Sequence, residues 1–196
     1  MSRKITEKKL VVMTHNPNKL KELAALLAPY DIEIISSGTL NLPEPEENGT
    51  SFAENAAIKA VFAAKSSGLP ALADDSGLEV AALGGEPGIY SARFAKDGDY
   101  MQAMSAINTR LEGNPDRGAN FTCALAVAWP DGDTELFVGK VFGTLCWPPM
   151  GEHGFGYDPF FVPDGYNESF GVLGAEIKEK ISHRSRAFAQ FITNCF

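Results

Sequence analysis

Hydrophobic and polar positions alternate in blocks, and the first blocks predict a strand, a turn and a helix. Residues 10–13 are all apolar, which favours a buried strand, and the polar residues 14–18 end it. From residue 19 to residue 27 the apolar positions have the spacing of one helix face. Isoleucines between positions 32 and 35 then indicate a second strand.

The second predicted helix has the clearest ends. It follows a loop rich in proline and glutamate over residues 42–49. Ser51 and Glu54 fit a capping box, an alanine-rich stretch favours helix, and Gly68 with Pro70 supplies the stop. The helix is therefore predicted to begin after Ser51 and to end before Gly68.

The second half of the chain contains a hairpin signal. Two mostly apolar segments, 121–129 and 136–140, flank the turn-forming residues 130–133. Because a hairpin joins antiparallel strands, the predicted sheet is mixed. The other predicted elements are a short strand over 71–73 that ends at Asp74-Asp75-Ser76-Gly77, a weaker helix over about 100–111, an apolar run over 160–162 and a final helix from near Ser182.

Length, charge and cysteine usage then narrow the class of protein. A chain of 196 residues fits one domain, 1–196, with residues 1–9 as a polar leader. The net charge of -8 argues against a protein that coats nucleic acid, although it allows a small anionic ligand. The three cysteines are widely spaced, which favours free thiols. With no signal peptide and no apolar run long enough to span a membrane, a cytoplasmic location is expected.

Four segments are candidates for chemistry, and two of them are rich in polar groups at predicted strand ends. The turn over residues 14–19 could expose helix N–H groups to a phosphate, but the turn alone is better explained as a plain Asn-Pro turn capped by Asn18. Asp74 and Asp75 repel each other unless a cation or a proton offsets them, which favours a metal over an aspartate turn completed by Ser76. Without a histidine pair or a cysteine cluster, that metal would be Mg²⁺ or Mn²⁺. Glu47 could add a carboxylate, although alone it is better explained as part of a solvated acidic loop.

The other two candidates lie near the C-terminus. Glycines flank Phe155, so its ring could stack on a nucleobase while Asp158 accepts a hydrogen bond; a glycine turn with Phe155 and Tyr157 in the core is equally compatible. Lys178 with His183 and Arg184 could bind a ligand, but exposed basic residues at a helix start are the more usual explanation.

Six motifs in a fixed order resemble those of the inosine triphosphate pyrophosphatase family, and the resemblance covers residues 10–189. The motifs are Thr-x-Asn-x-x-Lys-x-x-Glu at 14–22, Glu-x-Gly-x-Ser-Phe-x-Glu-Asn-Ala at 47–56, Ala-Asp-Asp-Ser-Gly-Leu at 73–78, Gly-Gly-x-Pro-Gly-Ile-Tyr-Ser-Ala-Arg at 84–93, Gly-Phe-Gly-Tyr-Asp-Pro at 154–159 and Lys-x-x-x-Ser-His-Arg at 178–184. The resemblance implies an α/β fold with an elongated mixed sheet flanked by helices, of the inosine triphosphatase-like type shared with Maf-like and Ham-like proteins. It also implies a homodimer and Mg²⁺-dependent cleavage of ITP, dITP and XTP to the monophosphate and pyrophosphate.

Carried over by position, the resemblance implies a role for each matching residue. Asp75 resembles the proton acceptor and a metal ligand, and Glu47 resembles its partner ligand. The remaining matches are to substrate-binding positions: Thr14, His15, Asn16, Pro17, Asn18, Lys19, Lys59 and Ser76 near the phosphates, and Phe155, Gly156, Tyr157, Asp158, Lys178, His183 and Arg184 near the base.

Three departures from the family pattern concern fine specificity rather than the core chemistry. His15 stands where a small residue is usual, Glu152-His153 replace small residues, and Gly171-Val172-Leu173-Gly174 replaces the usual segment before Lys178. Two other functions stay open: a Maf-like nucleotide pyrophosphatase that acts on other bases, and a catalytically idle nucleotide-sensing dimer.

Overall fold

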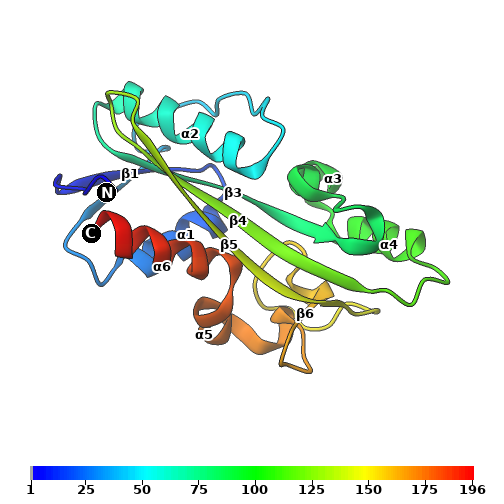
Figure 1. The fold of residues 1–196 in the computed structure, drawn as a ribbon. Helices are drawn as coiled ribbons and strands as arrows, with labels where there is room; N and C mark the ends of the chain where they lie inside the picture. Colours follow the sequence, from blue (N-terminus) through cyan, green and yellow to red (C-terminus); the bar gives the residue numbers. More distant parts are fainter. Residues whose placement is uncertain (1) are drawn as a thin grey trace. The chain divides into compact units, whose positions relative to one another are not determined.

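The computed structural model describes residues 2–196 and contains a six-stranded mixed sheet flanked by helices (Figure 1). The strand order is β2-β1-β3-β4-β5-β6. Strand β1 is parallel to β2 and β3, whereas β5 and β6 are antiparallel, so the predicted mixed α/β sheet is confirmed. The strands are β1 (Lys9–Met13), β2 (Glu33–Ser36), β3 (Ala71–Val80), β4 (Gly118–Ala128), β5 (Thr134–Leu145) and β6 (Phe161–Pro163).

Six α-helices accompany the strands in residues 2–196. They are α1 (Pro17–Leu27), α2 (Phe52–Ser67), α3 (Ser91–Phe94), α4 (Tyr100–Arg110), α5 (Phe170–Ile181) and α6 (His183–Cys195). The predicted ends of α2 are confirmed: Ser51 accepts the N–H of Glu54 at 3.2 Å, and Gly68 ends the helix in the left-handed conformation. No helix in the described part of the chain is long and apolar enough to cross a membrane.

The chain forms two compact units, each with its own hydrophobic core. The first consists of the residues up to Asp75 with Cys123–Gly139 and Arg184–Phe196, and the second of Ser76–Thr122 with Lys140–His183. In the first unit, Leu10, Leu72 and Phe191 are among the buried core residues. In the second unit, the buried core residues include Val80 and Phe161. The single domain expected from chain length stays a prediction.

The first unit has a helix layer on each face of its strands. Leu10, Val12 and Leu72 belong to one core with residues of α1 and α6, while the alternate positions of the same strands face the other way. Helix α2 packs its buried alanines on the second face, and Figure 1 shows α2 on one side of the strands with α1 and α6 on the other. Successive residues of β3 between Ala71 and Asp75 therefore face opposite helix layers.

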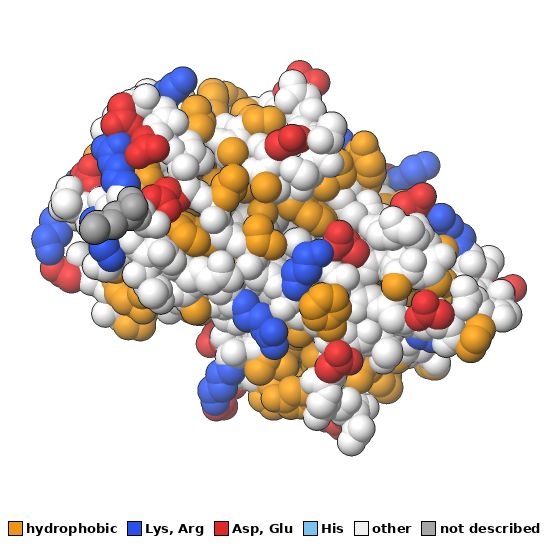
Figure 2. All heavy atoms as spheres, in the orientation of Figure 1, with side chains coloured by type: hydrophobic (Ala, Val, Ile, Leu, Met, Phe, Trp, Pro, Cys, Tyr) orange, Lys and Arg blue, Asp and Glu red, His pale blue; other side chains and the backbone are white. Residues whose placement is uncertain are grey.

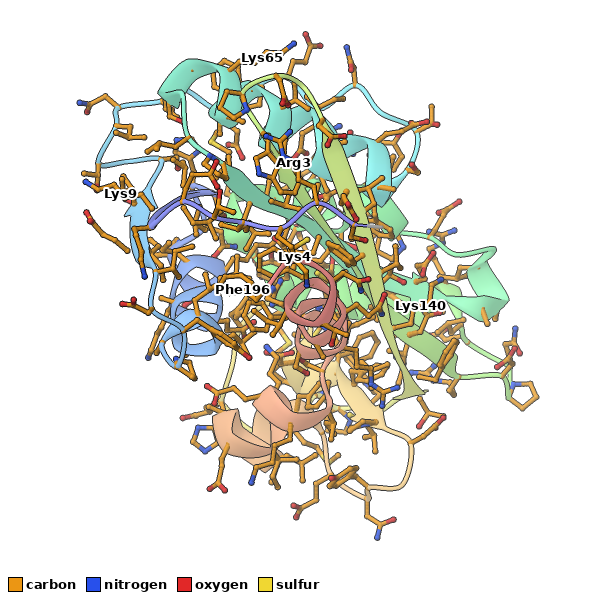
Figure 3. All side chains as sticks on the ribbon, turned by 60° about the vertical axis from the view of Figure 1, so that its left-hand side comes forward. Arg3, Lys4, Lys9, Lys65, Lys140 and Phe196 are labelled. Atoms are coloured by element: carbon orange, nitrogen blue, oxygen red, sulfur yellow. The ribbon has the colours of Figure 1, made fainter. Side chains whose placement is uncertain are left out.

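The polar N-terminal residues after Met1, which lies outside the described residues, pack on this first unit (Figure 3). The Arg3 guanidinium lies 4.7 Å from the centre of the Trp129 ring and 2.6 Å from Asp131 Oδ2. The N–H of Ile5 donates to the Cys195 carbonyl at 2.8 Å. The segment therefore contacts both the hairpin turn and the C-terminal helix.

Strand β3 and helices α3 and α5 differ from the sequence prediction, and the short helix α3 was not predicted. Strand β3 runs to Val80, so Asp74 and Asp75 lie inside a ten-residue strand and not at the end of a short one, because ion pairs and hydrogen bonds allow their burial. Helix α5 was not predicted, because glycine disfavours helix; Gly174 does interrupt it, with a φ of 75°. The hairpin is confirmed with longer strands, and the final helix begins at His183 as expected.

Candidate active site

The adjacent carboxylates of β3 point to opposite faces of the strand. Asp74 has the parity of Leu72 and faces α1 and α6, whereas Asp75 has the parity of Ala73 and faces α2. The two carboxylates therefore do not share one site, and the metal expected beside them stays a prediction for Asp75 alone. Each carboxylate has cationic partners of its own.

Asp74 is completely buried between two cationic side chains. Its Oδ1 lies 2.7 Å from Lys19 Nζ, and its Oδ2 accepts from Arg184 Nη2 at 2.8 Å and from Arg184 Nε at 3.1 Å. Burial alone would raise the pKa of Asp74, but the charges of Arg184 and Lys19 hold that pKa well below its usual range. Asp74 therefore stays ionised and orients both cations.

Asp75 has a different electrostatic environment. Asn55 Nδ2 donates to its Oδ2 at 3.3 Å, and Lys59 Nζ lies 3.5 Å from its Oδ1. Burial raises the pKa of Asp75, and the negative charges of Glu47 and Asp74 raise it further, against the opposing effect of Lys59. A carboxylate with a raised pKa holds a proton more readily, which suits a general base.

Glu47 and Asp75 converge on one cation. Both contact the ammonium group of Lys59, so the oxygen atoms of two carboxylates surround a position that already favours positive charge. Mg²⁺ typically binds one or two protein carboxylates and completes its shell with phosphate oxygens and water. Within residues 2–196 no group of three His, Cys, Asp or Glu side chains that could together hold a metal is present. The residues present therefore fit a hard divalent cation.

The turn before α1 does not expose its N–H groups as expected. Asn16, and not Asn18, caps the helix: its side-chain oxygen accepts from the N–H of Asn18 at 2.9 Å and of Lys19 at 3.2 Å, while Pro17 has no N–H to donate. The Asn16 N–H itself donates to Thr14 Oγ1 at 3.1 Å. Positive charge at this turn therefore comes mainly from the Lys19 side chain.

His15 connects this turn to the loop that carries Glu47. One ring nitrogen, Nε2, is 3.0 Å from the Leu42 carbonyl, and the other, Nδ1, is 3.9 Å from Glu44 Oε2. The histidine at position 15, where the family usually has a small residue, therefore adds a contact between the turn before α1 and the 42–49 loop.

In the second unit, the 154–158 loop is held in place by Asp158. Its Oδ2 accepts from the Phe155 N–H at 2.8 Å and from Lys178 Nζ at 2.7 Å. Lys178 Nζ also lies 4.5 Å from the centre of the Phe155 ring, a cation–π distance. A Cβ on Gly154 would lie 2.1 Å from Asp158 Oδ2, so only glycine permits this approach. The Phe155 ring is thus fixed and only partly buried.

The remaining predicted residues of this unit are in different environments. Tyr157 is buried, donates its hydroxyl to the Ser91 carbonyl at 2.8 Å and packs edge-on against Tyr100, so it belongs to the core. His183 stacks on Phe121 with ring centres 5.0 Å apart. Ser76 is partly buried, and Gly156 follows Phe155 in the loop.

The explanation of Lys178, His183 and Arg184 as exposed basic residues is wrong, since all three are buried. Arg184, in the first unit, also contacts Glu22 in addition to Asp74.

The same residues lie within a match to a known family model. Residues 10–194 match the model described as the Ham1 family. The chain belongs to the Ham1 family. Proteins named dITP/XTP pyrophosphatase are similar to it: that of Zymomonas mobilis is 49% identical over 98% of this chain and 94% of its own length, and that of Gluconobacter oxydans is 48% identical over 100% and 95%.

Solved Ham1 structures show the same fold. A HAM1 protein from Coxiella burnetii matches with a TM-score of 0.88 and 37% identity over 95% of this chain and 98% of its own. The Mycobacterium abscessus protein titled nucleoside-triphosphatase and dITP/XTP pyrophosphatase matches with a TM-score of 0.76 and 39% identity, over 94% and 98%. The predicted family and fold class are therefore confirmed.

Asn55 and Glu22 stand within two of the sequence motifs, but neither was predicted from the sequence to have a role in the candidate site. Asn55 stands four positions before Lys59, so both lie on the same face of α2. That spacing was a usable signal. Glu22 lies one turn after Lys19 on α1 and 162 positions from its partner Arg184, so no local pattern indicates their contact.

Proposed function

We propose that this chain hydrolyses deaminated purine nucleoside triphosphates, namely ITP, dITP and XTP, to the monophosphate and pyrophosphate. The observation that carries the proposal is the buried group on β3 and α2, where Asp75 has a raised pKa and shares Lys59 with Glu47. The names of the similar proteins support the substrate class. Hydrolysis of this kind removes such nucleotides from the pool used by polymerases.

The residues of the first unit supply the phosphate chemistry. Asp75 would orient and deprotonate the attacking water, while Lys19 and Lys59 would offset negative charge on the phosphates. We propose Mg²⁺ as the divalent metal, held by Glu47 and Asp75, where it would act as a Lewis acid toward the phosphates. The proposed phosphate-binding set is completed by Thr14, His15, Asn16, Pro17 and Asn18, and by Ser76, which follows Asp75 directly in the sequence. The proposed reaction requires no covalent intermediate between the protein and the nucleotide.

The residues of the second unit would recognise the base. Phe155 offers a ring face, and Gly156, Tyr157 and Asp158 form its loop. A 6-oxo group accepts hydrogen bonds from donors such as Lys178, His183 or backbone N–H groups, whereas the 6-amino group of adenine would leave them unpaired. GTP would be rejected because the pocket would offer no acceptor for its 2-amino group. The rate of GTP hydrolysis, measured beside that of ITP, tests this point.

Replacing Phe155 with alanine should weaken substrate binding and leave the chemical step largely intact. Stacking of a base on an aromatic ring contributes about 1–3 kcal/mol, so the KM for ITP should rise roughly 5- to 150-fold. The measurement is steady-state kinetics at saturating Mg²⁺. Phe142→Ala, which removes an exposed ring from β5, is the control and should leave the KM unchanged. An unchanged KM for Phe155→Ala would exclude stacking on this ring.

The direct test is product analysis with ITP, XTP, dITP, ATP, GTP and dTTP, each with Mg²⁺ and with a chelator. Monophosphate and pyrophosphate from the deaminated purines alone, lost in chelator, are the expected result. A preference for dTTP would instead indicate a Maf-like activity. Binding of ITP without turnover of any nucleotide would indicate a sensing role.

We further propose a homodimer that acts in the cytoplasm, where nucleoside triphosphates are made and used, without nucleic acid as a partner. The net charge of -8 supports the last point, since phosphate backbones require basic surfaces. On the face drawn in Figure 2, acidic, basic and hydrophobic side chains are interspersed. Light scattering of the purified protein tests the dimer: a monomer mass would reject it.

A further inference from the structure

Asn55 lies buried in the first turn of α2, and the proposed reaction gives it no role. Its Nδ2 donates to Asp75 Oδ2 at 3.3 Å, and its Oδ1 accepts the N–H of Gly49 at 2.9 Å. Lys59, one turn further along the same helix face, approaches the other oxygen of Asp75. The two oxygens of Asp75 are therefore engaged by two different side chains of α2.

We propose that Asn55 is a positioning residue that holds Asp75 and the Glu47 loop in one arrangement for the metal. The proposal rests on the pyrophosphatase function given above and deepens it. Gly49 is two residues from Glu47, so a single amide side chain ties together the carriers of both carboxylates. Contacts of this kind around ligating groups fix their orientation, and their loss typically weakens metal affinity or activity about 10- to 100-fold.

The chemistry of an amide suits this role better than that of other side chains. Asn55 donates to a carboxylate and accepts from a backbone N–H at once, and it carries no charge at any pH. An aspartate here would add a third carboxylate beside Asp75 and Glu47. A leucine of similar size would leave the Gly49 N–H without its acceptor.

Gly49 provides independent evidence that the loop is shaped for this contact. A Cβ at position 49 would lie 2.7 Å from Asn55 Oδ1 and 2.7 Å from Glu54 Cβ, closer than real Cβ atoms come. Glycine therefore permits the backbone of the loop to reach the Asn55 amide. Gly49→Ala should disturb the contact from the loop side while leaving Asn55 and Asp75 in place.

The test compares Asn55→Leu and Gly49→Ala with the unchanged protein by two measurements. The first is the Mg²⁺ concentration that half-activates ITP hydrolysis, which should rise about 10- to 100-fold in both variants, with a smaller change in kcat at saturating Mg²⁺. The second is calorimetric binding of the non-hydrolysable analogue inosine 5′-(α,β-imido)triphosphate. Its affinity should fall by a similar factor in Mg²⁺ and should not change in EDTA.

Glu54→Ala is the matched control, because Glu54 lies in the same turn but is exposed and contacts Thr50 instead of Asp75. This variant should lower the Tm and leave the Mg²⁺ dependence unchanged. The proposal is overturned by an unchanged half-activating concentration in both folded variants, or by equal loss of analogue binding in Mg²⁺ and in EDTA. Failure of both variants to fold would also overturn it, since the role would then be structural.

The two proposals fail in different ways. Absence of ITP hydrolysis by the unchanged protein would reject the pyrophosphatase function. The analogue would still report whether Asn55 governs Mg²⁺-dependent binding, since calorimetry requires no turnover.

Discussion

Asp75→Asn should reduce ITP turnover by about 10² to 10⁴-fold, the range that general-base catalysis contributes, while nucleotide binding persists. The substitution keeps the size of the side chain and its position on β3 but removes the charge that would accept the proton. Steady-state kinetics give the loss in kcat. Calorimetry with the non-hydrolysable analogue gives the remaining affinity in EDTA.

Glu79→Gln is the matched control for this prediction. Glu79 lies on the same strand and has the same parity as Asp75, but its carboxylate contacts Asn120, Thr122 and Lys140. Neutralising it should leave kcat within a factor of about 2. A folded Asp75→Asn variant with unchanged turnover would remove Asp75 from the reaction, and equal losses in both variants would point to a general effect of charge on the strand.

The sequence predicted the candidate residues better than their arrangement. Six ordered motifs identified Asp75, Glu47 and Phe155 without any structure. The neighbouring pair Asp74-Asp75 was placed at the end of a short strand, so its two side chains were not predicted to face opposite sides. The polar residues in the middle of β3 led to a predicted strand that was too short.

The physical reason for that failure lies in partners far away in the sequence. Asp74 is tolerated inside the strand because Arg184, 110 residues later, donates to it. No local propensity carries information about a pair so widely separated. By contrast, the caps of α2 depend on residues within a few positions, and they were predicted correctly.

Asp74→Asn should lower the free energy of unfolding by about 3–5 kcal/mol, although Asp74 is not the proposed base. Its side chain is fully buried and contacts Lys19 and Arg184, whose side chains are also largely buried. Removing the negative charge leaves two cations without adequate compensation, and an unpaired buried charge is strongly unfavourable. Urea unfolding at pH 7 measures the change.

The control and the pH dependence distinguish this cause from a general effect of losing an ion pair. Asp31→Asn removes the exposed pair with Lys8 and should hardly change stability. The pKa of Asp74 is lower in the folded protein than in the unfolded chain, so its contribution is complete above the unfolded value of about 3.8 and is lost as pH falls through the folded value. The gap between the unchanged protein and Asp74→Asn should therefore be constant from pH 5 to 7 and should shrink in stronger acid. A gap that instead widened in acid, or a loss no larger than that of Asp31→Asn, would show that the Lys19 and Arg184 charges do not depend on Asp74.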